Sequence, residues 1–150
     1  MKLLYYFFFA TFYTLSLLPL RVHYVISTLL YFLLRYVFRY RLKVVRRNLA
    51  TSFPEKSETQ LRRIERAYYR FFCDYLVESI KLLTISPEEI KRRLVFKGTE
   101  VVDQCVAEGQ SCAVYLGHYC NWEWITSLPL WVTPKAQYLP WYCAFPFAKK

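Results

Sequence analysis

The fold expected for this chain is decided by one stretch, Ser111-Cys-Ala-Val-Tyr-Leu-Gly-His118-Tyr-Cys-Asn-Trp-Glu123-Trp124. Residues 113–116 are apolar and partly β-branched or aromatic, and a glycine lies on each side of them, which predicts a short buried strand. The second glycine allows a sharp turn. A helix is expected to start near Asn121, because large rings then recur at helical intervals up to Pro129. The stretch therefore predicts a strand, a turn and a helix, with His118 at the mouth of the helix.

The residues just before this stretch extend it into an α/β unit. Residues 94–97 form a second candidate strand, and Thr99 is expected to cap a helix through Glu108 that Gly109 ends. The order strand, helix, strand is typical of a parallel crossover, in which functional groups gather at the carboxyl ends of the strands. We therefore expect the α/β class, with His118 at such an end.

Two capping boxes predict the helices that precede these strands. Ser57-Glu-Thr-Gln60 opens an amphipathic helix with an apolar stripe to Ile80, and Ser86-Pro-Glu-Glu89 opens a short helix that ends near Arg93. Cations on the longer helix could attract anionic headgroups or an acidic carrier protein, or they could form an ordinary solvated face. They are Arg62, Arg63, Arg66, Arg70 and Lys81.

The amino-terminal part of the chain is strongly apolar. The whole chain is 55% hydrophobic and 20% aromatic, with 3 glycines, so we expect much of its surface to meet lipid. Residues 3–20 carry no charge and would reach about 27 Å as a helix, just short of a hydrocarbon layer of roughly 30 Å. Residues 24–34 are apolar again, which fits either a second interfacial helix or one tilted helix whose charged side chains snorkel.

Positive charge is concentrated beside these apolar segments. The first fifty residues hold eight Lys or Arg side chains and no acid, which is +8 of the net +10. The cluster from Arg35 to Arg47 follows the apolar segments, so the positive-inside tendency places the rest of the chain in the cytoplasm. The five cysteines are odd in number and lack paired ligand spacing, so we expect a reducing compartment and no metal site. No nucleic-acid reader motif appears, and nucleic acid is not an expected partner.

His118 and Glu123 form a candidate base with its orienting carboxylate. The positive end of the helix dipole disfavours an imidazolium at His118, so a neutral ring there can accept a proton near pH 7. In a continuous helix the two residues would lie about 140° apart around the axis, so they can meet only across the intervening turn. Without a longer match, a structural histidine and a helix-start carboxylate are the preferred explanation of the two residues.

Two blocks of this sequence resemble the lipid A biosynthesis acyltransferases, the lauroyl and myristoyl transferases of the lysophospholipid acyltransferase superfamily. The first is Gly117-His-Tyr-Cys-Asn-Trp-Glu-Trp124, which resembles the active-site block of that family. The second is Tyr40-Arg-Leu-Lys-Val-Val-Arg-Arg-Asn-Leu49 with Ser52-Phe-Pro-Glu-Lys-Ser57, which resembles its basic segment after the membrane anchor. The resemblance covers about residues 10–133. It departs at Cys120, where the family usually has glycine, and family members are considerably longer, which implies a truncated member.

The resemblance implies roles for individual residues. His118 would remove a proton from an acceptor hydroxyl, and Glu123 would orient the imidazole. Asn121, Trp122 and Trp124 would bind substrate, with backbone amides near Asn121 facing the developing oxyanion. The two tryptophans would line the acyl channel, or they would serve as packing or lipid-facing groups. The resemblance implies neither a cofactor nor a metal ion.

The implied protein is an enzyme of the cell inner membrane with its soluble part facing the cytoplasm. It would move a fatty acyl chain from acyl carrier protein to a hydroxyl of a lipid A precursor or related glycolipid. Residues 1–39 would form a membrane anchor or interfacial helices, and residues 40–150 the amino-terminal part of an acyltransferase α/β domain that is incomplete at its C-terminus. The alternatives are a catalytically silent, truncated remnant that binds membrane lipid, and an acyltransferase directed at phospholipids.

Overall fold

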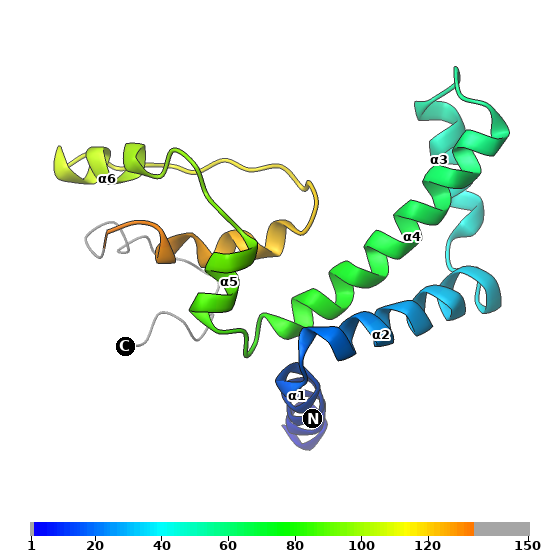
Figure 1. Ribbon diagram of the computed structural model, residues 1–150, viewed down its shortest axis with the longest axis horizontal. Coiled ribbons are helices and arrows are strands. Elements are labelled where there is room, and N and C mark those ends of the chain that lie inside the picture. The colour runs from blue at the N-terminus through cyan, green and yellow to red at the C-terminus, as the bar shows by residue number, and fades with distance from the viewer. Residues whose placement is uncertain (1, 134–150) are drawn as a thin grey trace. The chain divides into compact units, whose positions relative to one another are not determined.

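The computed structural model describes residues 2–133, and the chain divides into two compact units, Met1–Lys81 and Leu82–Lys150 (Figure 1). The first unit contains α1 (Lys2–Leu17), α2 (Leu20–Phe32), the π-helix η1 (Leu33–Val37), α3 (Leu42–Ser52) and α4 (Glu58–Lys81). The described part of the second unit contains α5 (Pro87–Arg93), α6 (Glu100–Ala107) and the 3-10 helix η2 (Trp122–Leu130). No β-strand occurs in residues 2–133, so the prediction of an α/β fold is wrong for the described chain.

Both predicted strands are irregular segments. Residues 94–97 and 113–116 form no ladder with any described residue. Tyr115 is 95% exposed and Val95 67% exposed, whereas Phe96 is half-buried against Trp131. The backbone N–H and C=O groups of a strand need a neighbouring strand, and two short strands alone make at best a marginal sheet. The two segments have the apolar composition of strands, but neither has a neighbouring strand to accept its backbone hydrogen bonds.

The first unit is organised around α2 and α4, which lie side by side and run in opposite directions (Figure 1). The Ser27 hydroxyl donates to Asp74 at 2.5 Å, and the Tyr24 hydroxyl donates to Glu78 at 2.9 Å. Tyr31, Tyr69 and Cys73 form the buried core between the two helices. The capping box predicted for α4 is confirmed: the Ser57 N–H donates to Gln60 Oε1 at 2.9 Å, and the Gln60 N–H donates to Ser57 Oγ at 3.3 Å.

A break at Pro19 separates α1 from α2. No single helix in residues 2–133 is long and apolar enough to cross a membrane; Lys2–Leu17 and Leu20–Val37 meet that criterion only as a pair, bent by 116°. The prediction of one membrane helix over residues 3–20 is therefore wrong, and so is the alternative of one long tilted helix. Proline disfavours helical geometry at the preceding residue and cannot donate a backbone hydrogen bond, so α1 ends before it.

Lys81, the last residue of α4, links the end of α1 to α4. Its ammonium group donates to the carbonyl oxygens of Ser16 at 2.8 Å and Leu18 at 3.0 Å. Carbonyls at the end of a helix lack intrahelical partners and attract cations. The end of α1 is therefore capped by a side chain more than sixty positions later in the sequence.

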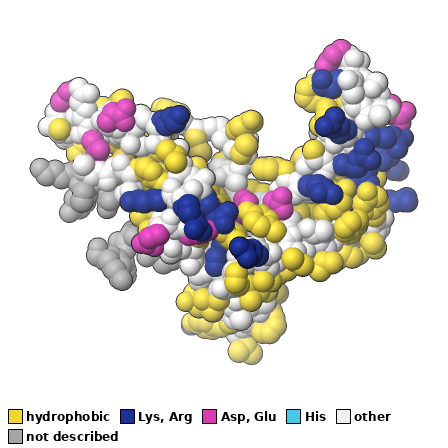
Figure 2. Space-filling view, viewed as in Figure 1, with side chains coloured by type: hydrophobic (Ala, Val, Ile, Leu, Met, Phe, Trp, Pro, Cys, Tyr) yellow, Lys and Arg dark blue, Asp and Glu magenta, His cyan; other side chains and the backbone are white. Residues whose placement is uncertain are grey.

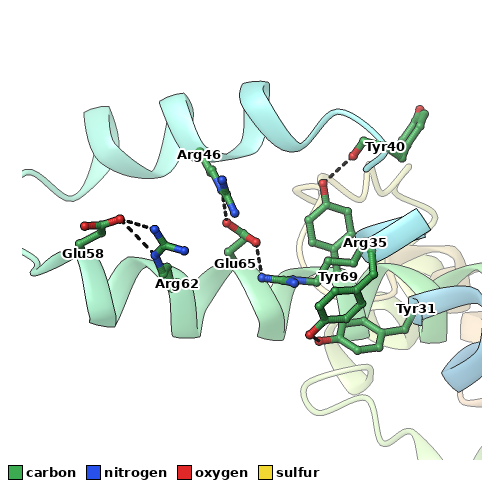
Figure 3. A network of polar contacts seen from close by, with 9 residues as sticks. Tyr31, Arg35, Tyr40, Arg46, Glu58, Arg62, Glu65 and Tyr69 are labelled. Atoms are coloured by element: carbon green, nitrogen blue, oxygen red, sulfur yellow. Dashed lines mark hydrogen bonds and ion pairs between the residues drawn. The ribbon is translucent and has the colours of Figure 1, made fainter. Parts of the chain in front are cut away.

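A buried carboxylate on α4 joins this helix to η1 and α3 (Figure 3). Glu65 of α4 is 1% exposed, and its two oxygens accept from Arg35 of η1 and Arg46 of α3, each at 2.7 Å. Close by, the Tyr69 hydroxyl donates to the backbone carbonyl of Tyr40 in the corner between η1 and α3. These contacts fix α3 on α4.

The second unit keeps the helices that its local signals predict. The Ser86 hydroxyl accepts from the Glu89 N–H at 3.2 Å, which confirms the predicted cap of α5. At the end of α6, Gly109 adopts a φ of 70°, and the Gln110 N–H donates to the Cys105 carbonyl at 2.8 Å. This is the left-handed glycine stop expected after residue 108. The start of α6 is also confirmed, although the Thr99 side chain makes no capping bond.

Candidate active site

His118 lies at the centre of a tight turn in the irregular segment that joins α6 to η2. The Tyr119 N–H donates to the Gly117 carbonyl at 2.9 Å, which is the three-residue γ-turn pattern. The side chain of His118 is exposed, and its ring lies edge-on to Trp122, with the ring centroids 4.7 Å apart and the planes at 65°. The turn predicted after Gly117 is therefore present, and it carries an accessible imidazole.

The backbone of Cys120, two residues after His118, explains why a glycine is expected at this position. Its φ is 51°, in the left-handed region that glycine enters freely and other residues enter at a cost of about 1–2 kcal/mol. Cys120 adopts this conformation where the chain passes from the turn into η2. A cysteine there adopts the same path under strain.

The helix predicted near Asn121 is confirmed as an element, but its geometry is that of a 3-10 helix. Asn121 precedes the first turn, Glu123 lies within it, and the Trp124 N–H donates to the Asn121 carbonyl at 3.3 Å. Pro129 lies inside η2 instead of ending it. Because successive turns of a 3-10 helix contain three residues, its side chains follow a different spacing from that of an α-helix.

The predicted substrate residues have different environments. Trp122 is half-buried and packs against His118, whereas Trp124 is buried, and its indole Nε1 has no hydrogen-bond partner among the described residues. A buried indole N–H without a partner is unfavourable in a closed core and available to a polar ligand atom. The structure thus brings His118 and Trp122 together, and the pairing of His118 with Glu123 stays a prediction.

The chain matches a protein-family model over residues 1–128, and the description of that model is bacterial lipid A biosynthesis acyltransferase. The chain belongs to this family. The matched region contains both blocks that carried the resemblance, so the resemblance is confirmed. A search of the curated proteins and a search of the solved structures found no significant match to the chain.

Family membership has a limited set of direct consequences. It associates the chain with acyltransferase chemistry, with lipid A biosynthesis and with a lipid as the acceptor. The acyl donor, the exact acceptor and the association with a membrane lie beyond the match.

The cations of α4, for which both an anionic partner and a solvated face are open, differ in their surroundings. Arg62 pairs with Glu58 one turn away, the Arg70 guanidinium lies 5.2 Å above the Tyr31 ring, and Lys81 caps α1. Arg63 and Arg66 remain exposed. Only part of the set is therefore available to an anionic partner.

Sequence reasoning missed two features of the first unit. One is Glu65, whose partners are distant in sequence, so no local spacing identifies it. The other is a groove between α3 and α4 with one aromatic wall. Its signal was present, because Tyr68 and Phe72 are spaced four residues apart on α4 and share one face.

Proposed function

We propose that this chain acts as a membrane-associated acyltransferase of lipid A biosynthesis. It moves a fatty acyl chain from the thioester of acyl carrier protein to a hydroxyl of a lipid A precursor or related glycolipid. The observation that carries this proposal is the family match over residues 1–128, which includes the whole His118 block.

In the proposed reaction, His118 acts as general base. Its imidazole takes the proton of the acceptor hydroxyl while that oxygen attacks the thioester carbonyl carbon, and the carbon–sulfur bond then breaks to release the thiol carrier. The proton held by His118 passes to the departing sulfur, so the base is regenerated. The exposed position of the ring supports access by both substrates, and the edge contact with Trp122 restricts its orientation.

Glu123 is assigned to orient the imidazole and to stabilise its protonated form. Asn121 and Trp122 follow the turn at the start of η2, and Trp124 presents a buried N–H that a polar atom of the substrate can satisfy. These roles follow the family block, and each is part of the proposal.

Association with the inner membrane is proposed from α1. Within this helix Ser16 is buried, and large apolar side chains along the rest of the helix are exposed, including Phe7, Phe8 and Phe12. Lipid is the solvent that such a surface fits, and the basic residues from Arg35 to Arg47 favour the cytoplasmic face.

The decisive experiment compares acyl transfer by the wild-type chain and His118→Ala in membranes supplied with an acyl carrier thioester and a lipid A precursor. We expect the rate to fall by about 100-fold or more, because general bases contribute roughly 10²–10⁴ to rates. Tyr119→Ala is the matched control, since Tyr119 is adjacent and 83% exposed, and its rate should stay near wild type. Equal rates for wild type and His118→Ala would reject the catalytic role and favour a silent lipid-binding protein.

A further inference from the structure

A groove runs between α3 and α4 in the first unit, at a distance along the chain from the His118 block. Its volume is about 210 Å³. We name it the Tyr40 groove. Its lining residues are Tyr40, Arg41, Val44, Val45, Asn48, Tyr68, Tyr69 and Phe72.

One wall of the Tyr40 groove is a row of nearly parallel aromatic rings. The Tyr40 and Phe72 rings lie 6.3 Å apart at 8°, and the Tyr68 and Phe72 rings lie 6.1 Å apart at 11°. Tyr69 is fully buried beneath them, and its hydroxyl holds the backbone carbonyl of Tyr40 in place (Figure 3). The row is therefore fixed by a buried hydrogen bond.

The other wall is a stripe at the start of α3, with two valines between two polar residues. Val44, Val45 and Asn48 share one face of α3, and Arg41 directly precedes the helix. Arg41 and Asn48 supply exposed polar groups at the two ends of this stripe. Arg41 forms no ion pair with any carboxylate in residues 2–133, so its guanidinium is available to an anion.

The backbone at the mouth of the groove is strained. Arg39 and Arg41, on either side of Tyr40, have φ values of 48° and 51°. Two non-glycine residues in the left-handed region within three positions are unusual, and such strain is commonly retained at ligand sites. Here it sets the direction in which the Tyr40 ring and the Arg41 side chain leave the backbone.

These groups match one class of ligand. The electron-rich faces of aromatic rings pack against the C–H face of a sugar ring, a guanidinium binds a phosphate through paired hydrogen bonds, and an amide such as Asn48 bonds to hydroxyls. A hydrocarbon chain would leave Arg41 and Asn48 unused, and a bare phosphate would leave the aromatic row unused. The combination fits a phosphorylated sugar.

We infer that the Tyr40 groove binds the phosphorylated sugar headgroup of a membrane glycolipid. The inference rests on the proposed function, since it assigns a docking site for the headgroup of the acceptor class. A lipid is the expected source of the sugar phosphate, because the same compact unit carries the exposed apolar side chains of α1. Figure 2 shows Lys and Arg side chains gathered around the α3 and α4 end of this unit.

General attraction to anionic lipid has to be separated from specific binding. Each basic residue near a membrane surface contributes to binding of any anionic vesicle. The test therefore measures co-sedimentation of the full chain with phosphatidylcholine vesicles that contain either lipid A or phosphatidylglycerol, at matched surface charge.

The charge test compares Arg41→Asn with Arg47→Gln. Asparagine tolerates the left-handed φ of residue 41, and Arg47 is an exposed cation of α3 that does not line the groove. Arg41→Asn should lose about tenfold more affinity for lipid A vesicles than for phosphatidylglycerol vesicles, because charge-assisted hydrogen bonds to phosphate are lost. Arg47→Gln should lose the same factor on both. Equal losses for the two variants on both vesicles would overturn the inference.

The stacking test compares Tyr68→Leu with Phe71→Leu. The two aromatic residues are similarly exposed, at 43% and 44%, but Phe71 does not line the groove. Tyr68→Leu should weaken binding to lipid A vesicles several-fold and leave phosphatidylglycerol binding unchanged, whereas Phe71→Leu should show no difference between the vesicles. The same behaviour in both variants would contradict the stacking role.

Two further measurements separate related explanations. Soluble glucosamine 1-phosphate that binds the chain as tightly as lipid A vesicles do would make a free sugar phosphate the ligand and overturn the membrane assignment. His118→Ala should bind lipid A vesicles as the wild type does, since the groove does not involve residue 118. Headgroup binding and acyl transfer can therefore fail independently of each other.

Discussion

At the scale of single residues, we expect the carboxylate of Glu65 to contribute strongly to the stability of the first unit. Glu65 is almost fully buried, and its main partner, Arg35, is 12% exposed, so both charges depend on each other for solvation. Removing one member of a buried ion pair costs far more than the pair itself contributes, because an uncompensated charge remains. The second partner, Arg46, is half-exposed and can regain water.

Glu65→Gln should therefore lower the free energy of unfolding by roughly 3 kcal/mol, at the low end of the range for broken buried pairs. Urea denaturation of the full chain followed by circular dichroism measures the change. Glu58→Gln is the matched control, because Glu58 pairs with Arg62 on the same helix but at an exposed site, where ion pairs add little. If both variants were equally stable, Glu65 would have no structural role.

Cys120 gives a second prediction at this scale, with the opposite sign. Cys120→Gly should stabilise the chain by about 0.5–1 kcal/mol, because glycine enters the left-handed region without the steric cost that cysteine bears. Gly109→Ala, at a φ of 70° and with open space around the added methyl group, should destabilise by a similar amount. Thermal unfolding of both variants checks the pair, and a loss of stability in Cys120→Gly would show that the cysteine side chain makes compensating contacts.

At the scale of elements, the end of α1 depends on a partner from α4. Lys81 donates to two carbonyl oxygens at the Pro19 break, where the helix itself offers no donors. Two features thus stabilise the 116° bend: the proline between the helices and the hydrogen bonds from the Lys81 ammonium group.

Lys81→Met should loosen this corner while leaving α4 helical. Amide hydrogen exchange in residues 15–23 should become roughly three- to tenfold faster, as expected for losing hydrogen bonds from a partly solvated charged donor. Lys91→Met, which removes an exposed lysine of α5, should leave exchange in that segment unchanged. Unaltered exchange in Lys81→Met would mean that Pro19 alone fixes the corner.

Elements also show which parts of the fold a sequence reveals. The starts of α4 and α5 and the end of α6 were predictable, because a serine cap or a glycine stop acts within four residues. The strands at 94–97 and 113–116 were predicted wrongly, because a strand is stable only with a partner. The prediction of one helix over residues 3–20 was wrong because it relied on continuous apolar composition. It gave too little weight to Pro19, which ends the helix.

At the scale of the whole chain, the two units differ in how much of each the sequence reveals. The sequence of the first unit indicates an apolar segment followed by a basic one. The contacts that organise this unit are Glu65 with Arg35 and Tyr69 with Tyr40. Each joins residues about thirty positions apart, so no short motif predicts it. The second unit carries the block from Gly117 to Trp124, so its candidate residues are visible from resemblance alone. Local chemistry identifies the candidate site, and long-range pairing determines the fold around the groove.

The capping of α1 by Lys81 has a consequence for the order of events during translation. The ribosome releases α1 well before the codon for residue 81 is read, so the apolar helix leaves the exit tunnel without its cap. If lipid receives α1 at that stage, as the proposed membrane association implies, contact with lipid precedes formation of the Lys81 cap. The remaining helices of the nascent chain would then pack against α1 after it has reached the lipid.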